Sequence, residues 1–342
     1  MKKYEHGGRA DVKYDFSANI NPLGMPPNVK QAIINSIDSA QKYPDPECRE
    51  LTEKIAQNEH TKAENIICGN GAADLIYRIV SVIKPHNAVI CSPAFSEYEK
   101  ALYENKCCVR KFSLSPEKDF LCDDTITDAL TSDTDMLIMC NPNNPTGKVI
   151  PTDLLEKICC TCEKNNIFFL CDECFMDFVK SSRTLTAGRF INNRVIILKA
   201  FTKIYAMPGI RLGYAVFNSS ALLEDVRRRG QFWPVSSIAQ AAGIAALQEK
   251  GFINKTVELI EKERRFLTES FRELGLRVFG SDANFILFYC GLPLDKILIQ
   301  KGIAIRNCEN FDCLGKGYFR IAVRSHGENL TLIKALKECI NG

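Results

Sequence analysis

The chain has 342 residues, of which 46% are hydrophobic and 25% charged, and its formal net charge is +3. This length exceeds one typical domain, and the composition is that of a globular protein with a large core. The basic residues are scattered, and their densest cluster, Arg227 to Arg229, is typical of a solvated helix face, so we expect no nucleic-acid partner. No window approaches the roughly 20 apolar residues of a membrane span, and charges stand where a signal peptide needs an apolar run. We therefore expect a cytoplasmic protein without a membrane partner.

Sixteen cysteines raise the question of disulfides or a metal. Adjacent pairs such as Cys107 and Cys108 do not resemble a secreted disulfide framework, and a chain of this length does not need one. Cys171 and Cys174 form a CxxC, and residues 159–162 form a CCxC, so a zinc or redox site is an alternative. Cys171 ends an apolar strand-like run, in which successive side chains point to opposite faces. This alternation would point the thiols of Cys171 and Cys174 away from a common metal. We expect reduced thiols and no metal.

Short apolar, β-branched runs bounded by turn residues recur between positions 66 and 217. Helix-like stretches lie between several of them, for example at 73–82 and 153–164. Strands that alternate with helices predict an α/β fold with an open, largely parallel sheet covered on both faces. The strand-like runs are NIIC, NAVICSP, CCVRKFSL, DMLIMCNP, IFFLCDE, RVIILKAF and RLGYAVF.

Beyond about residue 220 the pattern changes to long amphipathic helices, predicted over 220–247 and 254–274. The strand-like NFILFYC, IAIRN and YFRIAVR and a last helix over 328–340 predict a second, smaller α/β domain. We expect an amino-terminal segment at 1–40, a large domain at 41–222 and a small domain at 223–342. No flexible linker interrupts the chain, so a cleft between closely packed domains is the expected binding site.

Four polar segments follow predicted strands, where an α/β sheet places its ligand site. They are GNGAAD (69–74), NPNNPTG (141–147), LCDECF (170–175) and AFTKIYAMPGIRLGY (200–214). The first follows a strand and opens a helix, which presents free N–H groups to a phosphate. Any one of the four could be an ordinary loop or surface charge. The ordered set is the stronger signal.

With these segments the sequence resembles the fold type I pyridoxal-phosphate aminotransferase superfamily over nearly its whole length. Within it the chain looks most like the threonine-phosphate decarboxylases, which are close to histidinol-phosphate aminotransferases. The residues that favour the decarboxylases are HGG (6–8), DFSANINPLGMP (15–26), YPDP (43–46), Phe175 in DECFMDF, IRNCENF (305–311) and YFRIAVRS (318–325). The resemblance implies a mostly parallel seven-stranded sheet, a smaller C-terminal α/β domain, and a homodimer with shared sites.

The resemblance also implies pyridoxal 5'-phosphate as cofactor. Lys203 would be the Schiff-base lysine, whose amine reacts only when deprotonated, and Asp172 would keep the pyridine nitrogen protonated. Both are expected to be catalytic. Ala200 stands where relatives usually carry Ser or Thr, so one phosphate hydrogen bond is expected to be missing. The remaining cofactor-binding residues would be Gly71, Ala72, Ala73, Phe95, Asn144, Thr202, Arg211 and, from the neighbouring subunit, Tyr43.

The expected substrate carries two anionic groups, so its contacts are sought among the arginines. The resemblance implies that Arg320 clamps a substrate carboxylate and that Arg306 holds a substrate phosphate. Arg324 is either a further substrate contact or an ion pair at the rim. His6, Gly7 and Asn19 would reach in from the amino-terminal segment, and Asn144 would contact both substrate and cofactor.

The resemblance implies decarboxylation of an O-phospho-L-amino acid, with L-threonine O-3-phosphate giving (R)-1-aminopropan-2-yl phosphate in cobalamin biosynthesis. Phosphoserine or phosphonoalanine would present similar charges, and one methyl group discriminates by only about 1 to 3 kcal/mol. A histidinol-phosphate type aminotransferase is the nearest alternative, because the bond broken at Cα depends on positioning. A non-catalytic cofactor-binding regulator is disfavoured by the presence of both Lys203 and Asp172.

Overall fold

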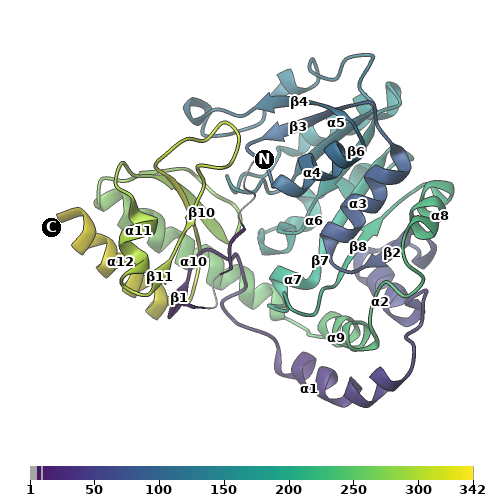
Figure 1. Cartoon of the computed structure of the whole chain (residues 1–342), viewed down its shortest axis with the longest axis horizontal. Helices are drawn as coiled ribbons and strands as arrows, with labels where there is room; N and C mark the ends of the chain where they lie inside the picture. Colours follow the sequence, from purple (N-terminus) through teal and green to yellow (C-terminus); the bar gives the residue numbers. More distant parts are fainter. Residues whose placement is uncertain (1–5, 9–10, 342) are drawn as a thin grey trace.

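The computed structural model describes residues 6–8 and 11–341. Its largest element is a seven-stranded sheet with the order β2-β8-β7-β6-β5-β3-β4 (Figure 1). The five strands from β7 to β4 run parallel, and β8 is antiparallel to both β7 and β2. The predicted seven-stranded, mostly parallel sheet is confirmed. The strands are β2 (Ile66–Gly69), β3 (Asn87–Ser92), β4 (Cys108–Ser113), β5 (Met136–Cys140), β6 (Phe168–Asp172), β7 (Val195–Ala200) and β8 (Gly213–Val216).

Helices between these strands cover the sheet. Helix α3 (Ala72–Ile83) packs on β7 and β8, α4 (Ser96–Glu104) on β3 and β4, and α5 (Thr152–Lys164) on β6 and β7. Strands β5 and β7 are buried along their whole length, as expected of parallel strands covered on both faces. The short helices α6 (Ser182–Leu185) and α7 (Phe201–Ile204) flank β7 in the chain.

The stretch predicted as one helix over 220–247 consists of two helices, so that prediction was wrong. Helix α8 (Ser220–Arg229) ends at Gly230, whose backbone is extended, and α9 (Ser237–Leu247) begins after Pro234. The Ser236 side chain caps α9 by accepting a hydrogen bond from the Ala239 amide. The amphipathic periodicity continued through this turn, and only the glycine and proline indicated the break.

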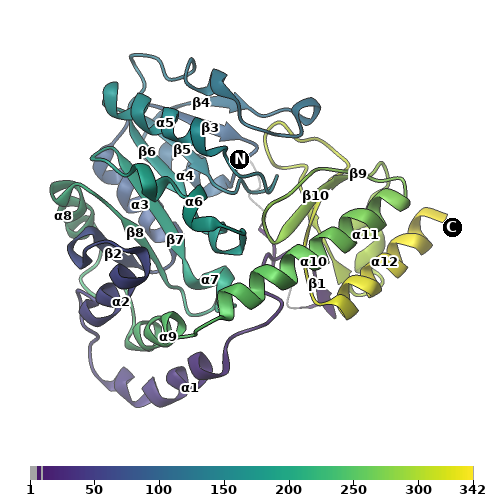
Figure 2. The same cartoon turned by 180° about the vertical axis from the view of Figure 1, so that it is seen from behind.

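The C-terminal part forms a four-stranded antiparallel sheet of order β12-β13-β10-β9. A long helix, α10 (Phe252–Glu273), lies beside it and reaches toward the large sheet (Figure 2). The predicted IAIRN strand is divided, because its first half pairs with the amino-terminal β1 (Tyr14–Asp15) in a separate parallel ribbon. The other elements are β9 (Arg277–Val278), β10 (Phe285–Tyr289), α11 (Leu294–Ile299), β11 (Ile303–Ala304), β12 (Arg306–Asn307), β13 (Tyr318–Ala322) and α12 (His326–Asn341).

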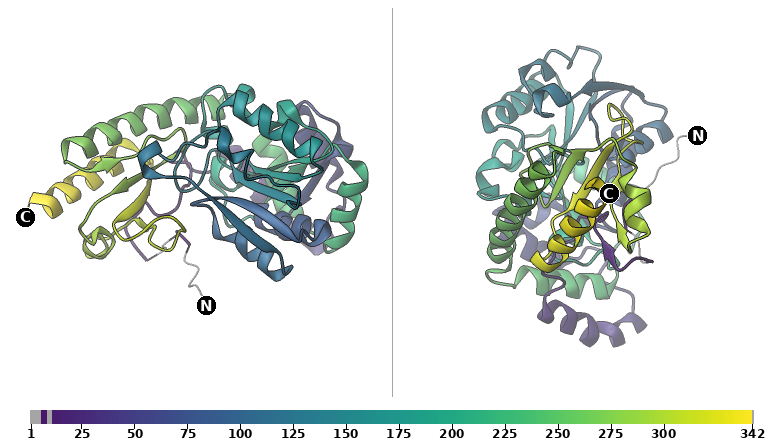
Figure 3. Two further views of the ribbon diagram at one scale, coloured as in Figure 1. Left: turned by 90° about the horizontal axis from the view of Figure 1, so that it is seen from above. Right: turned by 90° about the vertical axis from the view of Figure 1, so that its left-hand side faces the viewer.

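The amino-terminal chain thus runs from the small sheet to the far side of the large one, where α1 (Pro27–Ser36) and α2 (Arg49–Glu59) lie against α9 (Figure 1). Helix α8 packs on α3 and β2. Because α8 and α9 both contact elements of the large-sheet half, we propose that the small domain begins at α10 instead of at residue 223. The two sheets belong to two lobes that lie side by side (Figure 3). No helix in the described ranges is long and apolar enough to cross a membrane.

Candidate active site

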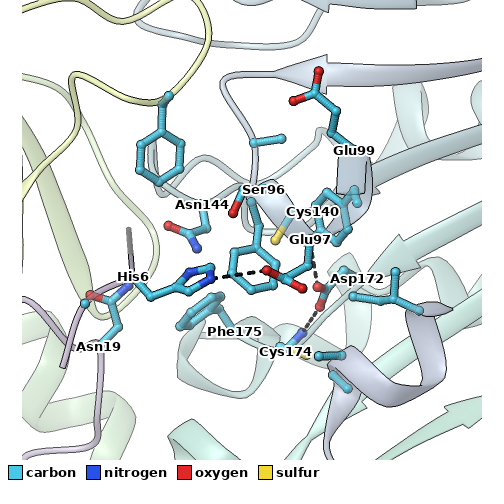
Figure 4. A pocket seen from close by; sticks show the side chains of 18 of the residues that line it. His6, Asn19, Ser96, Glu97, Glu99, Cys140, Asn144, Asp172, Cys174 and Phe175 are labelled. Carbon is cyan, nitrogen blue, oxygen red and sulfur yellow. Dashed lines mark hydrogen bonds and ion pairs between the residues drawn. The ribbon is translucent and has the colours of Figure 1, made fainter. Parts of the chain in front are cut away.

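A cavity of about 530 Å³ lies between the two sheets. Its walls come from the carboxyl ends of large-sheet strands, from the loops around β12 and β13, and from the amino-terminal segment. Figure 4 shows side chains from these three sources converging on one space. Thirteen residues predicted for the site line it: His6, Gly7, Asn19, Ala72, Ala73, Phe95, Asn144, Asp172, Thr202, Lys203, Arg211, Arg306 and Arg320.

Lys203 lies in α7, directly after β7, and its half-buried side chain lines the cavity. Burial lowers the pKa of this amine to about 8, helped by the positive charges of Arg320 and Arg211. A lysine with its ordinary pKa would be almost fully protonated at neutral pH. Lys203 therefore has a far larger neutral fraction, which is the nucleophilic form.

Asp172 is the last residue of β6 and is 5% exposed. Its Oδ2 accepts a 2.5 Å hydrogen bond from the Tyr98 hydroxyl, and its Oδ1 accepts a 2.9 Å bond from the Cys174 amide (Figure 4). Burial raises the pKa of Asp172, and these two donors oppose that rise. The carboxylate is consequently fixed in direction and suited to pairing with a cationic group inside the cavity.

The amino terminus of α3 forms a cradle for an anion. Gly71 precedes the helix with φ of +82°, and no side chain caps the first N–H groups. A Cβ at Gly71 would lie 2.5 Å from Nη2 of Arg211, so the guanidinium packs directly on this glycine. Ala72, Ala73, Thr202 and Arg211 all line the cavity here. Free helix N–H groups and a guanidinium are the donors that a phosphate group requires.

Arg320 in β13 faces the same cavity from the small sheet. Its Nη1 donates to Oδ1 of Asn144, and its Nη2 donates to the Ser17 carbonyl at 2.9 Å. Its buried Nε has no partner within the described ranges and so retains a free donor. Burial lowers the pKa of Arg320 to about 10, which marks a cation that an anionic ligand would stabilise. Asn144 is itself 9% exposed.

Arg306 in β12 is 7% exposed and neighbours Arg320 across the strand pair. Its Nη1 donates to the Asn307 carbonyl at 2.6 Å and its Nη2 to Oδ1 of Asn310 at 2.8 Å. The guanidinium carbon lies 5.3 Å from the Phe311 ring centroid. The two arginines thus present two cationic groups to one cavity.

The amino-terminal segment closes one side of this cavity. His6 Nε2 lies 3.2 Å from Oε1 of Glu97, and its ring centroid is 5.6 Å from that of Phe95 (Figure 4). A Cβ at Gly7 would lie 2.1 Å from the Ser17 carbonyl oxygen, so only glycine allows this approach. Asn19 is buried, and its side-chain oxygen has no partner within residues 6–8 and 11–341.

Two predicted site residues lie away from the cavity. Tyr43 is 78% exposed and stacks on Trp233 with ring centroids 4.0 Å apart. Arg324 lies beyond the end of β13 and donates to Glu328 at 2.8 Å, which is the ion-pair alternative considered for it. Nothing in this chain alone brings either side chain to the site.

Several lining residues were missed by the sequence reasoning. Tyr98 stands three residues after Phe95 on a helix, and that spacing was the available signal for it. Asn310 and Phe311 belong to the segment IRNCENF (305–311), which carried the resemblance, but they were not assigned to the site. Lys111 on β4 and Asp312 on the loop before β13 lie on segments joined only by the fold, so sequence spacing held no signal for them.

The family model for aminotransferase class I and II matches residues 11–336. The chain belongs to this family. The resemblance seen in the sequence is confirmed by the threonine-phosphate decarboxylase of Salmonella typhimurium strain LT2, which is 36% identical over 97% of this chain and 92% of its own length. An adenosylcobalamin biosynthesis bifunctional protein of Leptospira interrogans is 34% identical over 96% of this chain and 39% of its own length. The histidinol-phosphate aminotransferase of Clostridium acetobutylicum superimposes with a TM-score of 0.89 at 29% identity, covering 96% of this chain and 99% of that one.

The cysteines of this chain, all within the described residues, form no disulfides. All sixteen are free thiols, and burial is the main reason why the pKa of Cys171 and Cys140 lies well above the ordinary value. Among the described residues no group of three or more His, Cys, Asp or Glu side chains could hold a metal ion. The thiol of Cys140 instead donates to the Pro142 carbonyl at 3.1 Å.

Proposed function

We propose that this family member is a pyridoxal-phosphate-dependent decarboxylase of L-threonine O-3-phosphate that forms (R)-1-aminopropan-2-yl phosphate for cobalamin biosynthesis. The observation that carries the proposal is the pairing of Arg306 and Arg320 opposite Lys203 and Asp172 in one cavity. Two arginines match a substrate with two anionic groups. The relatives named for threonine phosphate and for adenosylcobalamin biosynthesis support the same assignment.

The residues present fit pyridoxal phosphate. The cradle at Gly71 and Arg211 suits its phosphate, and buried Asp172 suits a protonated ring nitrogen. The amine of Lys203, with its pKa lowered to about 8, suits its aldehyde. Bound there, the cofactor would supply a conjugated ring that accepts the electrons released when a bond at Cα breaks. We propose that Phe95, Asn144, Thr202 and the amides of Ala72 and Ala73 complete this cofactor site.

The arginines decide which bond at Cα breaks. We propose that Arg320 binds the α-carboxylate and that Arg306 binds the phosphate at the other end of the substrate, because both guanidinium groups line the cavity. With the substrate amine held at the cofactor, anchoring the carboxylate and the phosphate would prevent rotation about the N–Cα bond, so one bond at Cα would stay in the orientation required for cleavage. Cleavage of the Cα–carboxylate bond releases CO₂ and leaves its electron pair at Cα. Lys203, as the neighbouring acid, would return one proton to that carbon.

The amino-terminal segment would exclude water from this step. His6 bridges to Glu97 on α4, while Gly7 packs on Ser17 beside Arg320. We propose that His6, Gly7 and Asn19 contact the substrate from this side. In a dry site the attraction between the arginines and the two anionic groups is stronger than in water.

The direct test is a screen of the purified holoenzyme. L-Threonine O-3-phosphate, phosphoserine and phosphonoalanine are each assayed for CO₂ release, and the product from the first is identified by mass. We expect phosphothreonine to have the highest kcat/KM. Failure to release CO₂ from any of the three would overturn the proposal.

An aminotransferase of the histidinol-phosphate type is the second candidate, favoured by the superposition on the Clostridium acetobutylicum enzyme. It would use the same cavity and the same Lys203 but move a proton instead of releasing CO₂. Amino transfer from histidinol phosphate to 2-oxoglutarate, measured as glutamate formed, separates the two. Glutamate without CO₂ would establish the aminotransferase.

We propose further that the protein is a homodimer with shared sites. Tyr43 is 78% exposed and stacks on Trp233. The Trp233 ring also packs edge-on with Phe232, with ring centroids 4.9 Å apart. An exposed aromatic cluster of this kind is typical of a protein interface. Tyr43 would then reach the cofactor phosphate of the neighbouring subunit. Sedimentation analysis of the wild type and of Trp233→Ala tests the dimer.

A further inference from the structure

The loop of residues 308–317, which joins β12 to β13, fixes the direction of Arg306. Asn310 in this loop accepts a hydrogen bond from Nη2 of Arg306 at 2.8 Å, and the Phe311 ring lies 5.3 Å from the guanidinium carbon. We call residues 308–317 the Arg306 loop. Since two of the groups that orient the guanidinium belong to this loop, displacement of the loop would displace the arginine.

The Arg306 loop is held on the large-sheet half by ionic and polar contacts. Asp312 Oδ2 lies 2.5 Å from Nζ of Lys111 on β4, and the same Nζ lies 2.7 Å from Oε1 of Glu99 on α4. The next loop residue, Cys313, donates from its thiol to the Ser113 hydroxyl at 3.2 Å. Partial burial opposes the charged form of Lys111, but the hydrogen bonds that it donates to both carboxylates raise its pKa, so this cation persists at physiological pH.

Apolar contacts also hold the Arg306 loop on the large-sheet half. Phe311 and Leu314 of the loop belong to a small hydrophobic cluster that also contains Leu114 and Phe120 from the chain after β4. Phe120 is fully buried and packs edge-on against Phe279 at 4.9 Å. This cluster is shared by the two halves of the molecule, and burial of its side chains opposes their separation on this side. Packing therefore holds Phe311 and Leu314 of the loop, while the position of Asp312 depends on its ion pair with Lys111.

We propose that Lys111 and Asp312 are a positioning pair that holds the Arg306 loop and thereby sets the selectivity of the cavity for a phosphorylated substrate. The inference rests on the proposed function, because it gives Arg306 a phosphate to bind. Neither side chain needs to touch the substrate. The cation of Lys111 is already shared by the carboxylates of Glu99 and Asp312.

Asp312→Ala tests the pair, because Lys111 keeps Glu99 as a partner in this variant. The KM for phosphothreonine should rise about tenfold, which corresponds to weakening one charge-assisted contact. Turnover at saturation should change little, and the inhibition constant of L-threonine, which has no phosphate, should stay within about twofold of wild type. Glu338→Ala, which removes a similar 2.7 Å pair with Lys301 far from the cavity, is the matched control. Equal losses for both ligands, or no loss for either, would contradict the proposal.

A second variant separates positioning from a direct role of the carboxylate. Ser113→Cys is added to Asp312→Ala, so that the new thiol can form a disulfide with Cys313, whose sulfur lies 3.2 Å from the present hydroxyl oxygen. Glutathione disulfide is the oxidant, and a mass loss of two hydrogens verifies the bond. The tethered loop should restore KM to within about twofold of wild type, and dithiothreitol should remove the rescue. A verified disulfide without rescue would show that Asp312 acts through its own charge, and the positioning role would be wrong.

Failure of the proposed function gives a different result. If the wild-type holoenzyme releases no CO₂ from phosphothreonine, the substrate assignment is wrong, and the pair is tested with inorganic phosphate by calorimetry on the holoenzyme. Weaker phosphate binding in both Asp312→Ala and Arg306→Ala, but not in Glu338→Ala, would still support the positioning pair. Unchanged phosphate binding in Asp312→Ala would contradict it.

Discussion

The Tyr98 hydroxyl donates a 2.5 Å hydrogen bond to Oδ2 of Asp172. Tyr98 is fully buried on α4, and burial raises its pKa well above the ordinary value, so that the hydroxyl keeps its proton. The Phe95 ring packs edge-on against Tyr98 at 5.7 Å. The start of α4 therefore supplies both a ring that lines the cavity, from the N-cap residue Phe95, and the donor that orients the proposed catalytic carboxylate.

The first prediction concerns this donor. Tyr98→Phe should lower kcat about tenfold, because a hydrogen bond to a carboxylate contributes about 1.5 to 3 kcal/mol and part of that orients Asp172. Asp172→Asn should lower kcat by orders of magnitude while the cofactor remains bound, because the ring nitrogen would lose its anionic partner. Steady-state CO₂ release and visible absorbance measure the two effects. Tyr103→Phe on the same helix, where the ring is 57% exposed, is the control and should match wild type.

Tyr98 also shows what the sequence could and could not reveal. The carboxylate itself was predictable, because Asp172 ends a strand-like run and matches a known motif. Its hydroxyl partner is 74 positions away, and the contact exists only because β3 and β6 both neighbour β5. A pattern of period two predicts a strand but contains no information about which strands are adjacent.

The second prediction concerns the amine of Lys203. Because burial and the charge of Arg320 lower its pKa to about 8, the neutral form should appear as pH rises through about 8 instead of near 10.5. Competitive acetylation of the apoenzyme with acetic anhydride, followed by mass spectrometry of the peptide that contains Lys203, measures the midpoint. Arg320→Met removes one neighbouring positive charge and should move the midpoint upward. A midpoint near the ordinary value of lysine in the wild type would contradict the proposed role of the amine.

The third prediction concerns the anion cradle. Gly71→Ala places a methyl 2.5 Å from Nη2 of Arg211 and also strains a backbone with φ of +82°, so cofactor affinity should fall at least about tenfold. Gly275→Ala is the matched control, because its φ is +74° but a Cβ there meets nothing within 4 Å. Both variants should lose about 1 to 3 kcal/mol of stability, because an alanine is strained at a positive φ. Only Gly71→Ala should weaken cofactor binding, measured by absorbance titration. Equal affinities in the two variants would remove Gly71 from the phosphate site.

The fold was more predictable than the cavity. Each of the seven strand-like runs became a strand of the large sheet. The signal was clearest for β5 and β7, because parallel strands buried on both faces require continuous apolar sequence. The break between α8 and α9 was missed, because the local turn at Gly230 does not interrupt the apolar periodicity. The contact that holds the Arg306 loop could not be predicted from any local pattern. Its partner, Lys111, is 201 residues away from Asp312 on the other half of the molecule.

The last prediction separates the two arginines of the cavity. Arg306 and Arg320 lie opposite each other on β12 and β13, yet their surroundings differ. Arg306 is oriented by Asn310 on the loop side, whereas Arg320 is held by Asn144 and retains a free Nε donor within the described part of the chain. We therefore expect them to bind different anionic groups of one substrate.

Arg306→Ala should lose most of the preference for phosphothreonine over threonine, because a charge-assisted contact worth about 1.5 to 3 kcal/mol disappears only for the phosphorylated ligand. Arg320→Ala should weaken both amino acids but leave the product, (R)-1-aminopropan-2-yl phosphate, comparatively well bound, because that ligand has no carboxylate. Dissociation constants of the three ligands for the holoenzyme variants measure the pattern. Arg324→Ala, which removes an arginine paired with Glu328 outside the cavity, should change none of the three. If Arg306→Ala and Arg320→Ala weakened all three ligands equally, the arginines would support the fold instead, and the assignment of a phosphorylated amino acid would be wrong.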